Sequence, residues 1–167
     1  MTPTWFFIAC QFALIACALV AGVFLTFSDF VMRSLADSKT VAGIEAMQVI
    51  NRKVYRTFFM VLLLGMSAAW PLLMTYAGTH LEGSAANIIL AGGGLYLIGV
   101  LGVTLVFNVP MNNRLDQMDH TSNDAAIYWQ ATYLPRWTRW NTVRTIASAG
   151  SAICLLLALA DLMALQG

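Results

Sequence analysis

The chain has 167 residues, of which 59% are hydrophobic and only 10% charged, and its mean hydropathy is +0.72. Soluble domains average about 25% charged residues, so this composition excludes a water-soluble globular protein and predicts extensive contact with lipid. A net charge of +1 indicates no extended basic surface of the kind that binds phosphates, which excludes nucleic acid as a partner.

Four apolar runs are long enough to cross a membrane, because a helix needs about 20 residues to span a ~30 Å hydrocarbon core. None shows the period-two alternation of a membrane barrel strand, so we expect helices. The runs are Trp5–Phe27, Phe58–Tyr76, Ile88–Phe107 and Ile146–Leu165. The first lacks a preceding basic segment and is too long for a typical signal peptide, so we expect it to be retained. The predicted fold is all-α, a four-span transmembrane helix bundle forming one integral membrane domain over residues 1–167.

The basic residues fix the expected orientation. They lie only in the joint between the first and second runs and in the stretch that leads from the third run into the fourth. Because Lys and Arg gather on the cytoplasmic side, both joints should be cytoplasmic. Both termini and the His80–Glu82 loop should then lie on the outer, periplasmic side of the cell inner membrane. The nine residues are Arg33, Lys39, Arg52, Lys53, Arg56, Arg114, Arg136, Arg139 and Arg144.

The two joints are too long for simple turns and should contain structure of their own. Val41–Arg56 and Asp124–Trp140 both show helical spacing of apolar residues, so we expect two interfacial helices at the cytoplasmic side. Ser122 is placed to cap the second of them. Pro135 should break or kink that helix before the fourth span.

An internal repeat is expected from a short match. Gly22–Leu35 aligns with Gly102–Leu115 through shared Gly, Val, Leu and Phe positions and a final Leu, and Ser28 falls opposite Asn108. The offset covers two spans, so the halves should be parallel, related by an axis along the membrane normal. They would cover roughly residues 5–77 and 88–165.

Polar side chains gather where the spans meet the basic joints. Asn108 and Asn112 are spaced i, i+4 and share a helix face if Pro110 permits a helix there. Further members are Asn51, Asn113, Trp137, Trp140, Asn141 and Arg144. Buried amides need partners, so amides at one depth should pair and form a polar floor under an apolar cavity. The alternative is ordinary interfacial anchoring, since Trp and Arg are common at membrane surfaces.

The remaining reactive groups give no cofactor motif. Cys10, Cys17 and Cys154 lie inside apolar runs and are interpreted as small buried hydrophobes. No metal-binding, haem or phosphate-loop pattern occurs, so no metal and no cofactor are expected. Asp29 and His120 are possible bases, although Asp29 has Arg33 one turn away as an ion-pair partner.

Three strings resemble the hallmark segments of the anthrone oxygenase-like family of integral membrane proteins, over nearly the whole chain. They are Gly43–Asn51, Phe107–Asn113 with the pattern Asn-Val-Pro-x-Asn-Asn, and Trp137–Arg144 with the pattern Trp-x-x-Trp-Asn-x-x-Arg. The resemblance implies oxidation of the activated methylene of an anthrone by dioxygen as co-substrate, without metal or flavin.

Carried over by position, the resemblance assigns two sets of residues. Arg144, Asn108, Asn112, Asn141 and Asn51 would act on the developing oxyanion. Trp137, Trp140, Asn113, Phe107 and Met47 would bind the flat, hydrophobic substrate. Asp29, Glu45 or His120 would supply the base.

Two hypotheses follow. The first is a cofactor-independent oxygenase of a planar phenolic or anthrone-like molecule. The second is a non-catalytic membrane subunit that binds lipid, quinone or pigment, or packs against a larger membrane complex. Because four spans offer few interior positions, we expect a homo-oligomer or a partner chain under either hypothesis. An enzyme should turn the polar cluster inward around a cavity, whereas a packing subunit should use it for caps, for lipid headgroups or for contacts to another chain.

Overall fold

The protein is described from a computed structural model covering residues 2–164, which are helical apart from short connections and contain no strand. Leu165, the predicted end of the fourth span, lies outside these residues. In chain order the elements are α1 (Thr4–Thr26), η1 (Phe27–Val31), α2 (Met32–Asp37), α3 (Thr40–Lys53), η2 (Val54–Arg56), α4 (Phe58–His80), α5 (Ser84–Tyr96), η3 (Leu97–Gly102), η4 (Thr104–Asn108), α6 (Val109–Asp116), α7 (Asn123–Tyr128), η5 (Trp129–Tyr133) and α8 (Leu134–Ala164). All the η segments are π-helical except η2, which is a 3-10 turn.

The elements form four long helices, three by merging with their neighbours and one from α4 alone, which confirms the predicted spans. They cover Thr4–Asp37, Phe58–His80, Ser84–Asp116 and Asn123–Ala164, with mean hydropathy between 1.9 and 2.5 over their most apolar windows. The shortest has 23 residues, which at 1.5 Å per residue gives about 34 Å, enough to cross a ~30 Å hydrocarbon core. Many of their large apolar side chains point outward, where lipid must cover them. The chain is therefore a multi-pass membrane protein.

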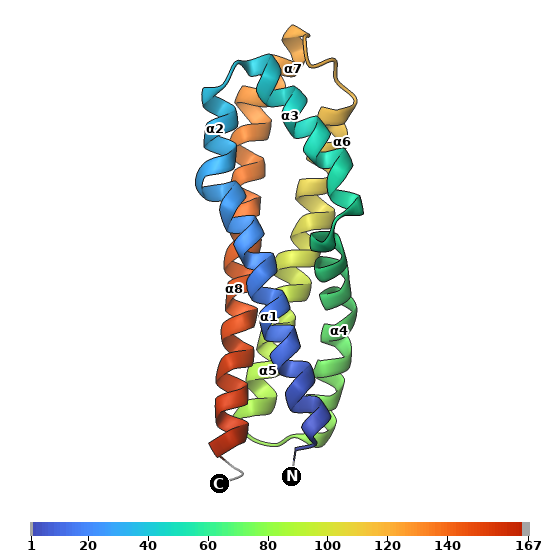
Figure 1. Cartoon of the computed structure of the whole chain (residues 1–167), viewed down its shortest axis with the longest axis vertical. Helices are drawn as coiled ribbons and strands as arrows, with labels where there is room; N and C mark the ends of the chain where they lie inside the picture. Colours follow the sequence, from blue (N-terminus) through green and yellow to red (C-terminus); the bar gives the residue numbers. More distant parts are fainter. Residues whose placement is uncertain (1, 165–167) are drawn as a thin grey trace.

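The four helices form an elongated bundle with both ends of the chain at the same end (Figure 1). Within it, α1 packs against α4 and α8, and α5 packs against the same two helices. The core of this part contains Trp70, Tyr96 and Leu155, all fully buried. Gly92 permits the close approach of α5 and α8, because a Cβ there would lie 2.8 Å from the Cβ of Cys154.

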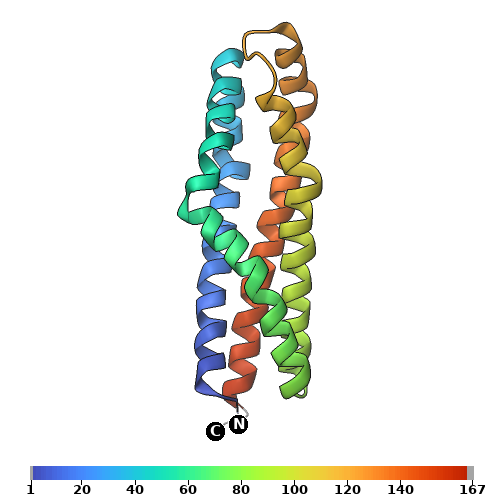
Figure 2. The ribbon, with the colours of Figure 1, turned by 90° about the vertical axis from the view of Figure 1, so that its right-hand side faces the viewer.

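Both joints are helical, as expected, and they continue the bundle along its long axis as a second tier (Figures 1 and 2). Met32, Ile44 and Leu115 are central to a separate buried core there. Gln48 ties α3 to the end of α6, since its side-chain amide donates to the carbonyl oxygens of Leu115 and Met118, each at 2.8 Å. This tier, which we call the basic tier, carries the two joints with their Lys and Arg residues.

Two local predictions meet different outcomes. Ser122 caps α7 as expected, its hydroxyl accepting from the backbone N–H of Ala125 at 3.1 Å. Pro135 was predicted to break or kink the helix, and the break does not occur, because one helix runs from Asn123 to Ala164. The π-helical turn η5 ends just before the proline. A widened turn relieves the clash between the proline ring and the preceding carbonyls, so the helix continues.

Candidate functional site

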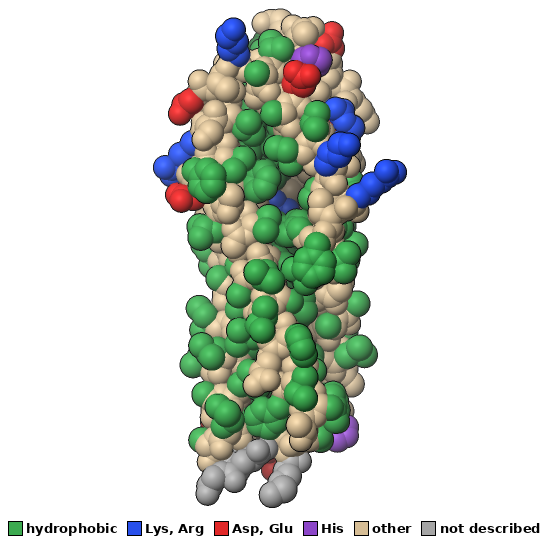
Figure 3. Space-filling view, viewed as in Figure 1, with side chains coloured by type: hydrophobic (Ala, Val, Ile, Leu, Met, Phe, Trp, Pro, Cys, Tyr) green, Lys and Arg blue, Asp and Glu red, His purple; other side chains and the backbone are tan. Residues whose placement is uncertain are grey.

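A cavity of about 330 Å³ lies where the spans pass into the basic tier. The corner between α3 and α4 creates room for it: the backbone leaves helical geometry at Thr57, with φ −115° and ψ 157°, before α4 begins. In the space-filling view the molecule is hollowed at this level (Figure 3). The lining residues are Val23, Phe24, Phe27, Met47, Ile50, Asn51, Lys53, Val54, Tyr55, Thr57, Phe59, Met60, Leu63, Thr104, Asn108, Val109, Asn112, Trp137, Asn141 and Arg144.

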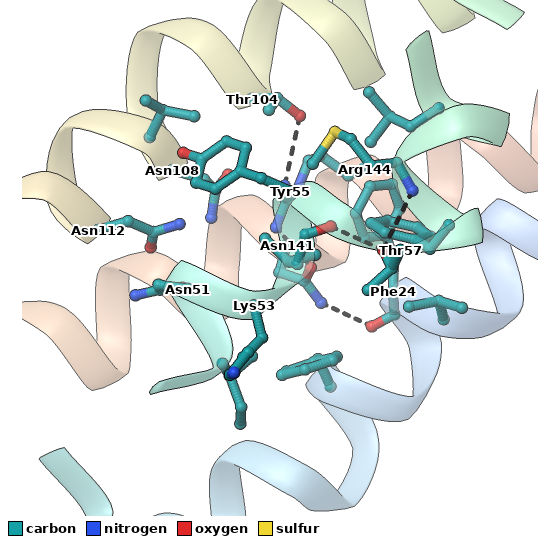
Figure 4. A pocket seen from close by; sticks show the side chains of 18 of the residues that line it. Phe24, Asn51, Lys53, Tyr55, Thr57, Thr104, Asn108, Asn112, Asn141 and Arg144 are labelled. Carbon is teal, nitrogen blue, oxygen red and sulfur yellow. Dashed lines mark hydrogen bonds between the residues drawn. The ribbon is translucent and has the colours of Figure 1, made fainter. Parts of the chain in front are cut away.

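Arg144 is the buried basic side chain of this lining, only 6% exposed. Its guanidinium donates to Asn141 Oδ1 at 2.7 Å and to Thr104 Oγ1 at 3.3 Å (Figure 4). The charge also lies over the ring of Phe24, 4.3 Å from its centroid. Among residues 2–164 no carboxylate pairs with it, and its Nε atom has no hydrogen-bond partner. A buried charge without a counter-charge is costly, so this wall is suited to an anionic or strongly polar ligand atom.

Two amides hold the elements around this charge. Asn141 Nδ2 donates to the backbone oxygen of Phe24 at 2.6 Å and to Ser28 Oγ at 2.7 Å, which fastens α8 to α1. Asn108 Nδ2 donates to the backbone oxygen of Trp137 at 3.2 Å, which fastens η4 to α8. The side-chain oxygen of Asn108 is buried without a partner. These amides serve packing and also face the cavity.

A second group of amides is organised by Tyr133, which the sequence analysis did not identify. Asn51 Nδ2 donates to its hydroxyl at 3.2 Å, and the hydroxyl donates to Asn112 Oδ1 at 2.8 Å. Trp137 Nε1 donates to the same Asn112 oxygen at 2.7 Å. Tyr133 and Trp137 lie four residues apart on one helix face and stack with centroids 6.1 Å apart. That aromatic spacing was the signal available in the sequence.

The structure brings together seven of the ten predicted site residues. The lining contains Arg144, Asn51, Asn108, Asn112, Asn141, Trp137 and Met47. Three lie elsewhere: Trp140 stacks on Phe107 with centroids 3.7 Å apart, and neither ring lines the cavity, while Asn113 is exposed. The lining also includes Thr104, Lys53 and Tyr55, which the sequence analysis did not single out.

None of the three predicted bases lines the cavity. Asp29 and Glu45 are exposed, and Asp29 forms no ion pair with Arg33 among the described residues. His120 lies in the turn before α7. There the backbone N–H and the hydroxyl of Thr121 both donate to Asp119, which keeps the pKa of this exposed carboxyl below its usual value. Residues 2–164 contain no group of three His, Cys, Asp or Glu side chains placed to hold a metal ion.

The sequence was compared with protein families, curated proteins and solved structures. The sequence model of a family described as anthrone oxygenase matches residues 46–154, well over half of the chain. The chain belongs to the anthrone oxygenase family. No curated protein and no solved structure matches it.

The family match covers most of the cavity. It runs from α3 into α8 and includes Met47, the four lining asparagines, Trp137 and Arg144. The remaining wall comes from α1 and η1, through Val23, Phe24 and Phe27, which precede the matched region. In this member of the anthrone oxygenase family, the buried charge is thus enclosed partly by residues inside the match and partly by residues before it.

Proposed function

We propose that this membrane protein of the anthrone oxygenase family oxidises a planar phenolic, anthrone-like molecule with dioxygen, without metal or flavin. The observation that carries the proposal is Arg144, a buried guanidinium without a carboxylate partner among the described residues, in the wall of an apolar cavity. An anthrone that loses a proton becomes an electron-rich oxyanion, and this is the charge that the wall is suited to accept.

The size and lining of the cavity support a small aromatic ligand. Ligand pockets commonly measure about 300–1,000 Å³ and combine apolar walls with a few placed polar groups. The cavity, at about 330 Å³, is at the compact end of that range. Phe24, Phe27 and Trp137 provide flat surfaces. The amides come from several elements: Asn51 from α3, beside Lys53 (Figure 4), Asn108 and Asn112 from η4 and α6, and Asn141 from α8.

In the proposed reaction Arg144 stabilises the oxyanion formed when the methylene carbon of the substrate loses a proton. The carbanion form gives electrons to dioxygen, and a carbon–oxygen bond forms at that carbon. The peroxide anion so formed takes up a proton from the mouth of the cavity and becomes a hydroperoxide. Loss of water from the hydroperoxide leaves a second carbonyl, so one oxygen atom enters the product and the other leaves as water. The first proton leaves towards the mouth of the cavity, where Lys53 and Tyr55 are the other titratable lining groups.

The test uses purified protein in lipid vesicles, dithranol (a dihydroxyanthrone) as substrate, and oxygen consumption with quinone formation as readouts. We expect Arg144→Ala to lower turnover by about 10²–10³-fold, the usual effect of losing an oxyanion donor. Arg144→Lys should also lose most turnover, because an ammonium does not replace the planar fork. Arg139→Ala removes an exposed arginine of the same helix and should have no effect. Wild-type turnover in Arg144→Ala would contradict the proposal and favour a non-catalytic membrane subunit.

For the orientation, we propose that the basic tier is cytoplasmic and that both termini face the outer side of the inner membrane. A membrane-impermeant thiol reagent added to intact cells should label Glu82→Cys and not Lys39→Cys. Glu82 is preferred to its neighbour Gly83, whose φ of +80° favours glycine. Labelling at position 39 alone would reverse the orientation.

For assembly, we propose a homo-oligomer or a complex with another membrane chain. Only 22–39% of the residues in the spanning windows are buried within the chain, which leaves most of the helical surface for lipid or a neighbour. Light scattering of the detergent-extracted protein gives its mass. A single 18.2 kDa species under mild extraction would contradict this proposal.

A further inference from the structure

The cavity opens on the side of the molecule, between α1 and the α3–α4 corner. Its inner wall is buried, with Phe24 3% and Leu63 2% exposed. Its lining also reaches the surface, because Val23 on α1 is 37% exposed and Tyr55 on the corner is 57% exposed. Figure 3 shows the hollow on the long face of the bundle, with atoms of a basic side chain visible in its depth. The opening is therefore lateral.

The surface around the opening changes from apolar to basic at the level of the cavity. On the side of the spans, the neighbouring side chains are large, apolar and outward-facing, as expected for contact with lipid chains. They are Leu19 at 52%, Phe58 at 71% and Val61 at 65% exposed. On the side of the basic tier, Arg52, Lys53 and Arg56 are exposed on the corner itself. The opening thus lies at the boundary between lipid chains and lipid headgroups.

Polarity increases from the span-side rim of the opening towards Arg144, whereas the rim on the side of the basic tier carries Lys53 and Tyr55. Val23 and Met60 are apolar lining residues on the two helices that flank the opening, whereas Arg144 and Asn108 belong to the buried part of the lining. A molecule that dissolves in the bilayer with its polar edge near the headgroups is already aligned with this gradient. It needs only lateral movement to bring that edge to the guanidinium.

We infer that the cavity is filled from the bilayer, between α1 and the α3–α4 corner, by a membrane-dissolved, weakly acidic aromatic molecule whose polar edge leads toward Arg144. The identity of this molecule rests on the proposed function, because it is the substrate of that reaction. The route rests on the placement of the opening and applies to binding without turnover. Val23 stands on the lipid-side rim of this route and should control the rate of exchange.

The experiment measures binding without oxygen. Dithranol is mixed with the protein in phosphatidylcholine vesicles under anaerobic conditions, and its absorbance is followed by stopped flow. Val23→Trp narrows the rim, so association and dissociation should both slow by about tenfold or more while Kd changes little. Val61→Trp is the matched control: it places the same side chain on the lipid-facing surface of α4, outside the cavity lining, and should change neither rate. Circular dichroism melting verifies that both variants are folded.

Three results overturn the inference. Unchanged rates in Val23→Trp place the entrance elsewhere. Faster dissociation with unchanged association makes Val23 part of the inner wall. Absence of saturable dithranol binding by the wild-type protein contradicts a weakly acidic aromatic molecule as the ligand. Oxygen is then admitted to separate the two proposals. Bound dithranol that is not oxidised contradicts the proposed reaction and leaves the route intact. Oxidation of dithranol, with unchanged association and dissociation rates in Val23→Trp, contradicts the route alone.

Discussion

Tyr133→Phe tests whether one hydroxyl holds the amide wall of the cavity together. The hydroxyl accepts from Asn51 Nδ2 at 3.2 Å and donates to Asn112 Oδ1 at 2.8 Å, so the substitution removes two hydrogen bonds between three helical segments. Asn112 Oδ1 keeps its bond from Trp137 Nε1 at 2.7 Å, so only the Asn51 donor loses its sole partner.

The expected loss of stability follows from this count. A hydrogen bond between membrane helices contributes about 0.6 kcal/mol on average and up to about 1.7 kcal/mol. A buried donor left without a partner costs about 1–3 kcal/mol, and the lower end applies here because Asn51 lines a cavity instead of a close-packed core. Tyr133→Phe should therefore lower the free energy of unfolding by about 1–2 kcal/mol.

The assay is reversible unfolding by sodium dodecyl sulfate in mixed micelles, followed by circular dichroism. Tyr128→Phe is the matched control, since Tyr128 is buried in the same aromatic cluster but its hydroxyl bonds to no described residue. It should change stability by less than about 0.5 kcal/mol. Equal effects of the two substitutions would refute the assignment of Tyr133 as the organiser of the amides.

Two further substitutions test the packing that positions the site. Gly92→Ala should destabilise the bundle by about 1–3 kcal/mol, because the new methyl group would lie 2.8 Å from the Cβ of Cys154. Gly94→Ala, which meets nothing within 4 Å, should be neutral or stabilising in the same thermal melts. Gln48→Leu removes both bonds from α3 to the end of α6 and should cost about 1–3 kcal/mol. Gln130→Leu, at an exposed position with one bond of 3.4 Å, should cost less than about 0.5 kcal/mol, and the reverse order would contradict the role of Gln48.

The spans were predictable because lipid imposes a strong and local rule on composition. The apolar run Trp5–Phe27 coincides closely with α1. The sequence did not predict that three of the helices continue well beyond their apolar runs, since those extensions are stabilised by a second protein core rather than by lipid. Whether the halves are related by a twofold axis stays a prediction. Both matched segments contain a π-helical turn, but only the first half breaks its chain direction between joint and span, at Thr57.

Helical geometry explains which site residues were predicted well. Counting 100° per residue, Asn141 and Arg144 lie about 40° and 20° from Trp137 and so share its face. Trp140 lies about 60° away on the edge of that stripe, where it meets Phe107 instead of the cavity. Asn113 is turned by about 100° from Asn112 and is exposed. Spacing alone does not distinguish the centre of a stripe from its edge.

Tyr133 was missed for a different reason. It lies two residues before Pro135, in a segment where the sequence predicted a helix break, and such a break would have separated it from Trp137. The π-helical turn keeps the helix continuous and keeps the two rings stacked. Its role also depends on partners in α3 and α6, which no local pattern in the sequence connects.

The π-helical turns have a consequence for how insertions and deletions act on this protein. A single-turn π segment corresponds to an α-helix with one additional residue, so the helix faces on its two sides are out of phase with a regular 3.6-residue repeat. Removing one residue from η4 would leave a continuous helix, yet it would rotate α5 relative to α6 by about 100°. The spans would still satisfy the membrane, while Asn108 and Asn112 would no longer face the cavity together with the packed face of α5. The number of residues in these π-helical segments is therefore constrained by the rotation between the flanking helix faces and not by hydrophobicity. A variant one residue shorter would insert into the membrane normally and lose its site.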